Sequence, residues 1–254
     1  MFAWRGRIGL IQPTHRGKSF HYWYRLAPPG VEIVPTFIGF RRGEREAFER
    51  AFDKAEEIAA SLVEVGANII AIGGLPPFAL KGYEFDSAWT ERISSRLGVP
   101  VVTPMQACAL ALRTLGVRRV ALASYFGEEL AAALATYFSN FGLDSIVLEG
   151  YRRGQESEGL FSTPLMSLDD VSKEQVYRYC RDAVLPRRSE VDGLFVAGSG
   201  WDATPMVEHL ESDLGIPVVI SLLAQEWLAL RRLHVAVPME GYGSLWRDHA
   251  NADV

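Results

Sequence analysis

The phrase Leu97-Gly98-Val99-Pro100-Val101-Val102 returns later in the chain as Leu214-Gly215-Ile216-Pro217-Val218-Val219. Each copy is followed by an apolar helical stretch with a similar ending, at 111–115 in the first copy and 229–233 in the second. Each copy is also preceded by an apolar run that ends in glycines. Because strand, glycine turn, helix, second strand and second helix recur in the same order, the sequence predicts an internal duplication.

Short apolar runs rich in β-branched residues alternate with longer stretches of helical spacing, the clearest of which is 44–65. Such runs are typical of buried parallel strands, so the predicted fold is α/β, with a mainly parallel sheet flanked by helices in each half. We divide the halves as residues 1–103 together with 222–254, and residues 104–221. The strands are expected at 7–12, 33–38, 67–73, 99–103, 119–124, 145–149, 193–197 and 216–221.

Composition excludes several classes of function. The chain has 254 residues, of which 48% are hydrophobic, and a formal charge of -5, so it offers no basic surface for nucleic acid. No apolar run approaches the roughly 20 residues needed to span a bilayer, and the N-terminus does not resemble a signal peptide. Two cysteines make no disulfide framework. We therefore expect a cytoplasmic protein with no nucleic-acid or membrane partner, and a homo-oligomer remains open.

Both halves place glycines where a predicted strand ends, Gly73-Gly74 in the first and Gly198-Ser199-Gly200 in the second. Ligands of parallel sheets bind beyond the carboxyl ends of the strands, and halves that face each other would bring both turns to one cleft. Glycine allows a ligand to approach the backbone, and consecutive N–H groups can bind an anion. The expected partner is a small carboxylate; the alternative is that the glycines only make tight turns.

The order of several phrases resembles the aspartate/glutamate racemase superfamily, and most closely its arylmalonate decarboxylase and maleate cis–trans isomerase branch. The resemblance covers nearly the whole chain. The phrases that carry it lie at 8–13, 67–74, 97–102, 115–123, 191–194, 214–219 and 226–227.

This resemblance implies a pseudo-twofold fold with the active site between the halves, without metal or cofactor. Family racemases and maleate isomerases use two cysteines, one at a strand end in each half, and arylmalonate decarboxylases keep only the second. Here the two positions fall on Gly73 and Gly198. Where the decarboxylases have hydroxyl residues this chain has Gly74 and Leu75, and their tyrosine falls on Phe126. We therefore expect the cysteine chemistry of the family to be absent.

Neither of the cysteines present is expected to replace the missing pair. Cys108 and Cys180 fall in predicted helices at 105–115 and 176–184. A free cysteine in an apolar helix usually behaves as a small buried hydrophobe, so both are interpreted as structural.

The remaining candidates for proton transfer or nucleophilic attack are His15, Tyr125 and Ser199, each beside the end of a predicted strand. Asp202 is either a partner of Ser199 and His15 or the cap of a helix that begins near Thr204. The aromatic segment 20–24 belongs either to the core or to a cover over the site. The residues expected to contact substrate are Pro13, Thr14, Gly73, Gly74, Leu75, Ser124, Phe126, Gly198, Gly200 and Trp201.

The leading functional hypothesis is a decarboxylase-like enzyme that acts on a small aryl- or alkyl-substituted carboxylate. Backbone N–H groups of both turns would stabilise an enediolate, protonated by His15, Tyr125 or water, with poor stereochemical control. One alternative is a non-catalytic carboxylate-binding protein. The others are a maleate isomerase-like or racemase-like enzyme with relocated catalytic residues, and a hydrolytic enzyme built on Ser199, His15 and Asp202.

Overall fold

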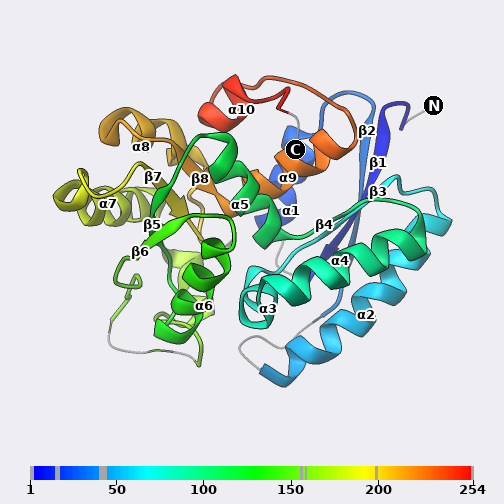
Figure 1. The fold of residues 1–254 in the computed structure, drawn as a ribbon, viewed down its shortest axis with the longest axis horizontal. Helices are drawn as coiled ribbons and strands as arrows, with labels where there is room; N and C mark the ends of the chain where they lie inside the picture. Colours follow the sequence, from blue (N-terminus) through cyan, green and yellow to red (C-terminus); the bar gives the residue numbers. More distant parts are fainter. Residues whose placement is uncertain are drawn as a thin grey trace.

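The computed structural model describes residues 3–14, 18–39, 45–154, 157, 159–197 and 200–252. In this part of the chain, two four-stranded parallel sheets have the strand orders β2-β1-β3-β4 and β6-β5-β7-β8 (Figure 1). All the predicted strands are confirmed, with ends shifted by two residues at most. Their bounds are β1 Gly6–Gln12, β2 Val31–Phe37, β3 Ile69–Ile72, β4 Val101–Val102, β5 Arg119–Ala123, β6 Asp144–Val147, β7 Gly193–Val196 and β8 Val218–Ile220.

The two sheets repeat one topology. Strand β1 pairs with β2 and β3, and β3 pairs with β4. The second sheet has the same pairings, with β5 in the place of β1 and β7 in the place of β3. This repetition confirms the duplicated α/β fold, and it places the glycine turns after β3 and β7 at equivalent strand ends.

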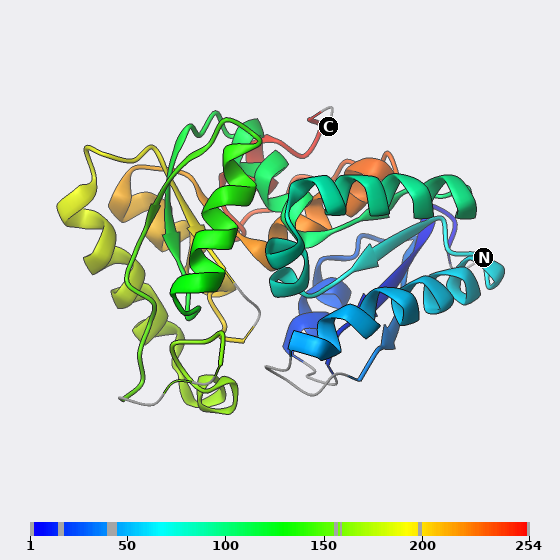
Figure 2. The same ribbon diagram turned by 60° about the horizontal axis from the view of Figure 1, so that its bottom comes forward.

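Helices flank both sheets (Figures 1 and 2). Helices α2 and α4 lie side by side against the first sheet, α1 contacts β2, and α6 contacts β6 of the second sheet. The predicted helix 44–65 is confirmed as α2, which ends before Gly66 at a φ of +90°. The bounds are α1 Lys18–Leu26, α2 Arg45–Glu64, α3 Leu75–Lys81, α4 Tyr83–Leu97, α5 Pro104–Thr114, α6 Glu128–Ser139, α7 Lys173–Val184, α8 Val207–Leu214, α9 Ser221–Arg232 and α10 Ser244–Asp248, with short 3-10 helices at Leu165–Asp170, Leu185–Arg187 and Thr204–Met206.

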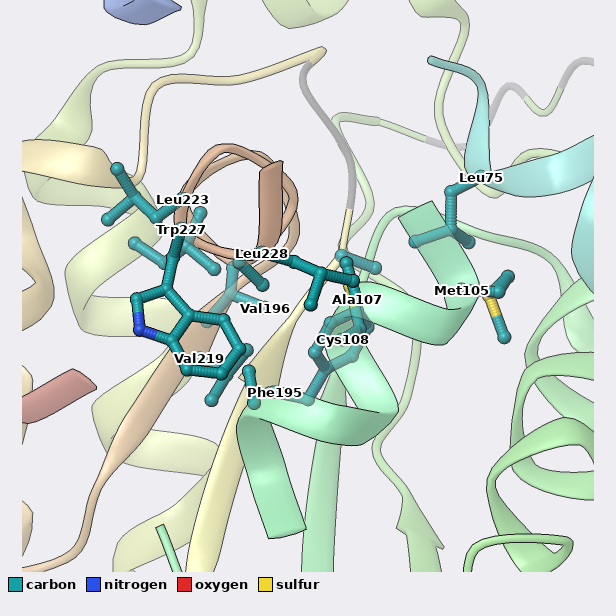
Figure 3. Close-up of a cluster of buried hydrophobic side chains, with 14 of the residues drawn as sticks. Leu75, Met105, Ala107, Cys108, Phe195, Val196, Val219, Leu223, Trp227 and Leu228 are labelled. Carbon is teal, nitrogen blue, oxygen red and sulfur yellow. The ribbon is translucent and has the colours of Figure 1, made fainter. Parts of the chain in front are cut away.

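Helices α5 and α9 pack against each other between the sheets (Figure 3). Helix α9 follows β8 but also contacts β3 and β4, while α5 follows β4 and contacts β8. Leu223 and Leu228 of α9 are almost completely buried, and burial of each contributes about 2 kcal/mol. The amide of Gln225 donates to the carbonyl oxygens of Ile72, at 2.7 Å, and Val102, at 3.4 Å. The end of the first sheet is thereby tied to a helix from the far end of the chain.

Within the described ranges, no helix has both the length and the apolar character needed to cross a membrane.

Candidate active site

The turn after β3 is closely packed against the end of β1. The N–H of Gly73 donates to the carbonyl oxygen of Ile11 at 2.7 Å, so this group extends the sheet. The side chain of Gln12 lies beside Gly73 and is 5% exposed. A Cβ added at Gly73 would lie 2.8 Å from Oε1 of Gln12. Any side chain at position 73 would therefore require the amide of Gln12 to move.

The next residue, Gly74, has a φ of +101°, which disfavours every other residue. A Cβ there would lie 3.3 Å from Cγ of Pro13, so Pro13 packs directly on the turn. Helix α3 begins at the buried Leu75 and continues with two prolines, which have no N–H. The donors that this turn presents at the helix start are therefore the N–H groups of Gly74 and Leu75.

The equivalent turn after β7 is braced by aromatic side chains. The N–H of Gly200 donates to Oη of Tyr125 at 3.1 Å, and a Cβ at Gly200 would lie 2.7 Å from that oxygen. The indole N–H of Trp201 donates to the carbonyl oxygen of Ala197 at 3.2 Å. The ring centroids of Trp201 and Tyr125 are 5.1 Å apart. Tyr125 and Trp201 thus hold the far side of the second turn in place.

The end of β5 supplies the remaining expected residues of the second half. Ser124 is buried, and its Oγ accepts a hydrogen bond from the N–H of Phe126 at 3.2 Å. Phe126 is also buried and forms an isolated antiparallel bridge with Phe161. Tyr179 of α7 donates to the carbonyl oxygen of Ser124 at 3.1 Å. In this arrangement Ser124 and Phe126 shape the strand end.

Several expected site residues lie outside the described part of the chain: His15, Gly198 and Ser199. Pro13 and Thr14 are described and are partly buried at the end of β1. The expectation that the N–H groups of both turns serve a ligand needs correction at Gly73 and Gly200. Both groups donate within the protein, so these glycines contribute close packing.

Asp202 is not a helix cap. The 3-10 helix that follows begins after Ala203, with no hydrogen bond from a side-chain cap. Instead, Oδ1 of Asp202 accepts a hydrogen bond from Oη of Tyr22 in α1 at 2.7 Å. Burial and this carboxylate raise the pKa of Tyr22. The aromatic segment therefore reaches from the first half to the turn of the second half, two residues beyond Gly200.

The interpretation of both cysteines as structural is confirmed. Cys108 in α5 and Cys180 in α7 have no exposed surface, and burial raises the pKa of each thiol. Thiols that keep their protons inside helices are poor nucleophiles.

Sequence reasoning missed a second connection between the halves. Asp86 of α4 is fully buried, and its carboxylate accepts hydrogen bonds from Tyr137 of α6 at 2.6 Å and from Thr103 at 2.9 Å. Thr90 and Gln106 donate to it as well, at 3.1 and 3.2 Å. Burial raises the pKa of Asp86 to about 6 against the opposing effect of these donors. The available signal was an aspartate whose neighbours at helical spacing, Trp89 and Ile93, are apolar.

Two parallel sheets of one topology are the architecture expected from the resemblance to the aspartate/glutamate racemase superfamily, whose members include lyases and isomerases. The model of the family described as arylmalonate decarboxylase matches residues 8–246. The chain therefore belongs to the arylmalonate decarboxylase family.

Individual relatives agree with this assignment. The arylmalonate decarboxylase of Bordetella bronchiseptica is 27% identical over 240 residues, which cover 94% of this chain and 95% of the relative. A crystal structure of arylmalonate decarboxylase superposes with a TM-score of 0.77 at 24% identity, covering 94% of this chain and 98% of the other. The maleate isomerase Iso of Pseudomonas putida S16 superposes with a TM-score of 0.79 at 17% identity, covering 96% and 98%. The structural matches support the fold, and the family match supports an enzyme of the lyase or isomerase type.

Proposed function

We propose that this chain removes carbon dioxide from a small malonate that carries an aryl or alkyl substituent. The observation that carries the proposal is Gly73, because the end of β3 offers no acid or base and Gln12 fills the adjacent space. Racemisation needs a proton donor and a proton acceptor on opposite faces of the substrate. Attack on a double bond needs a reactive thiol, and both thiols are buried in helices. Decarboxylation requires neither.

In the proposed reaction the bond between the α-carbon and one carboxylate breaks, and carbon dioxide leaves. The electron pair stays on the α-carbon and delocalises into the second carboxylate as an enediolate. We assign to the N–H groups of Gly74 and Leu75, at the start of α3, the stabilisation of that charge, as preorganised donors do in other sites. Leu75 and Trp201 are buried side chains close in sequence to the two turns, and apolar surroundings of this kind would disfavour the departing carboxylate relative to neutral carbon dioxide. One proton then completes the product.

The test is release of carbon dioxide from a panel of aryl- and alkyl-substituted malonates, with Gly74→Ala as the diagnostic variant. The matched control is Gly82→Ala, because Gly82 also has a positive φ, of +83°, and lies at the other end of α3. Both variants should lose similar stability, but only Gly74→Ala should lose turnover by roughly 100-fold. A folded protein that releases no carbon dioxide from any substrate contradicts the proposal. Thermal stabilisation by malonates without turnover would instead identify a binding protein.

A further inference from the structure

A groove on the second half contains none of the residues expected to contact substrate. It lies between α7 and the end of β6 together with the segment that follows this strand, and its volume is about 680 Å³. Small-molecule sites usually have volumes of roughly 300–1,000 Å³. In the described part of the chain β6 pairs only with β5, so it is an edge strand, and Val147 at its end is 44% exposed (Figure 1). A ligand can therefore reach the groove directly from solvent.

Helix α7 contributes one of its faces to the groove. The residues of α7 that line it recur at intervals of three or four positions: Gln175, Arg178, Tyr179, Asp182 and Ala183. This spacing places them on one side of the helix. The core side of α7 carries Val176, Cys180 and Val184, which have no exposed surface. One wall of the groove is thus a helix whose position the core fixes.

The charged groups of the groove leave a surplus of positive charge. Arg152, Arg178 and Arg187 line it, against the two carboxylates of Glu149 and Asp182. The chain as a whole has a formal charge of -5, so this local excess runs against the overall balance. A groove with one surplus positive charge favours a ligand with one negative charge.

Two of these guanidinium groups are available to a ligand. Arg178 forms no hydrogen bond or ion pair with any other described residue. Nε of Arg152 is 3.7 Å from Oε1 of Glu149, and the side chain of Glu149 is 86% exposed. An ion pair so exposed contributes little, so a ligand can replace it. A guanidinium presents a planar set of donors that suits a carboxylate.

The groove also has an aromatic wall. Tyr151 and Tyr179 line it, with their ring centroids 5.4 Å apart and their planes at 79°. Oη of Tyr179 is 3.1 Å from the carbonyl oxygen of Ser124 and 2.7 Å from that of Glu149, which holds the ring in place. Both rings also contact the buried Trp201, at centroid distances of 5.4 and 5.7 Å. Fixed rings of this kind pack well against an aromatic ligand.

We propose that this groove is a second ligand site, for a small aromatic monocarboxylate. Arg178 and Arg152 bind the carboxylate, and the ring of the ligand packs against Tyr151 and Tyr179. The single negative charge of the ligand matches the surplus charge of the groove. The inference does not depend on the proposed decarboxylation, although the arylacetates that this reaction would release belong to the same class of ligand.

The test is an NMR titration of the isotope-labelled protein with phenylacetate. The amide signals of Gly150 and Ala183, which line the groove, should shift with a common Kd of about 1 mM. Acetate, which lacks the ring, and phenylethylamine, which carries the opposite charge, should each bind about tenfold more weakly. Equal binding of phenylethylamine overturns the role of the guanidinium groups. Shifts confined to the amide of Gly74 would place phenylacetate only at the turn after β3 and overturn the second site.

Arg178→Ala should raise the Kd measured at Gly150 and Ala183 about tenfold, because it removes a charged donor. Arg118→Ala is the matched control. Arg118 is also exposed, its side chain has no ion pair among the described residues, and it does not line the groove. This variant should keep the Kd of the parent. The same Kd in Arg178→Ala as in the parent overturns the proposal. Because the titration measures binding alone, a parent that releases no carbon dioxide contradicts only the decarboxylase.

Discussion

Asp86 and Glu226 are both completely buried carboxyl groups on helices, yet their surroundings differ entirely. Four donors from α4, α5, α6 and the end of β4 surround Asp86, whereas Glu226 has no partner among the described residues. Burial raises the pKa of both, but the donors hold that of Asp86 to about 6. Near neutral pH Asp86 is therefore mainly an ionised acceptor that ties Tyr137 of the second half to the first, whereas burial favours the protonated form of Glu226. Burial alone does not assign a role to a carboxyl group; its hydrogen-bond donors do.

The largest effect should follow from Asp86→Ala. The substitution leaves the buried hydroxyls of Tyr137 and Thr103 without their acceptor, so the free energy of unfolding at pH 7 should fall by about 3–5 kcal/mol. Urea denaturation measures this loss. Asp86→Asn retains one acceptor oxygen and should lose less. Equal losses in the two variants would show that the charge, and not the acceptor, is what matters at this position.

The pH dependence of stability should show the raised pKa of Asp86. The folded state binds the proton of Asp86 more tightly than the unfolded chain does, because an unfolded aspartate has a pKa near 3.8. The stability that comes from this tighter binding is therefore fully present below about pH 4 and is lost as the pH rises through about 6. A shift of this size corresponds to about 3 kcal/mol. Urea midpoints at several pH values should fall over this interval in the parent. In Asp86→Asn the same interval should be flatter, and a slope identical to that of the parent would contradict the assignment.

Glu226→Leu should change stability in the opposite direction to Asp86→Ala. Replacement of the unpartnered carboxyl by an apolar side chain of similar size should raise the free energy of unfolding at pH 7 by about 2 kcal/mol. The same denaturation experiment applies. A destabilised Glu226→Leu would mean that the carboxyl has a stabilising partner in the folded protein, and the contrast with Asp86 would fail.

The smallest effect should follow from Tyr137→Phe, which removes one of the four donors and keeps the ring. Stability should fall by about 1.5 kcal/mol, the contribution of one hydrogen bond to a charged group. The pKa of Asp86 should rise above 6, because Tyr137 is the donor with the largest lowering effect on it. NMR titration of the side-chain carboxyl carbon would detect the shift. An unchanged pKa would mean that the other three donors compensate.

Local signals were sufficient to predict the fold. Most strands were short apolar runs, several of them rich in β-branched residues, and the repeated phrase at 97–102 and 214–219 indicated the duplication. Gly74 was expected at a turn because it directly follows a predicted strand, and its positive φ agrees. Periodicity and turn composition depend on residues close in sequence, which is why they can be interpreted from one chain.

The site was only partly predictable, because its decisive contacts join distant residues. The Tyr22–Asp202 and Gln225–Ile72 hydrogen bonds span 180 and 153 positions. No local pattern indicates that the N–H groups of Gly73 and Gly200 are already used inside the protein. The one local signal for Glu226 was its place in the mainly apolar run 222–230. A carboxylic acid is unexpected in a helix whose other residues are almost all buried.

The placement of α5 and α9 has a consequence for the history of the chain. Helix α9 follows the second sheet yet contacts β3 and β4, and α5 follows the first sheet yet contacts β8, so each half supplies one helix that packs on the sheet of the other. A single copy of the repeat would leave the surface under the exchanged helix uncovered, and a second copy could cover it. The exchange of α5 and α9 is thus the arrangement that two copies of a single repeat would have in a twofold homodimer, here held within one chain.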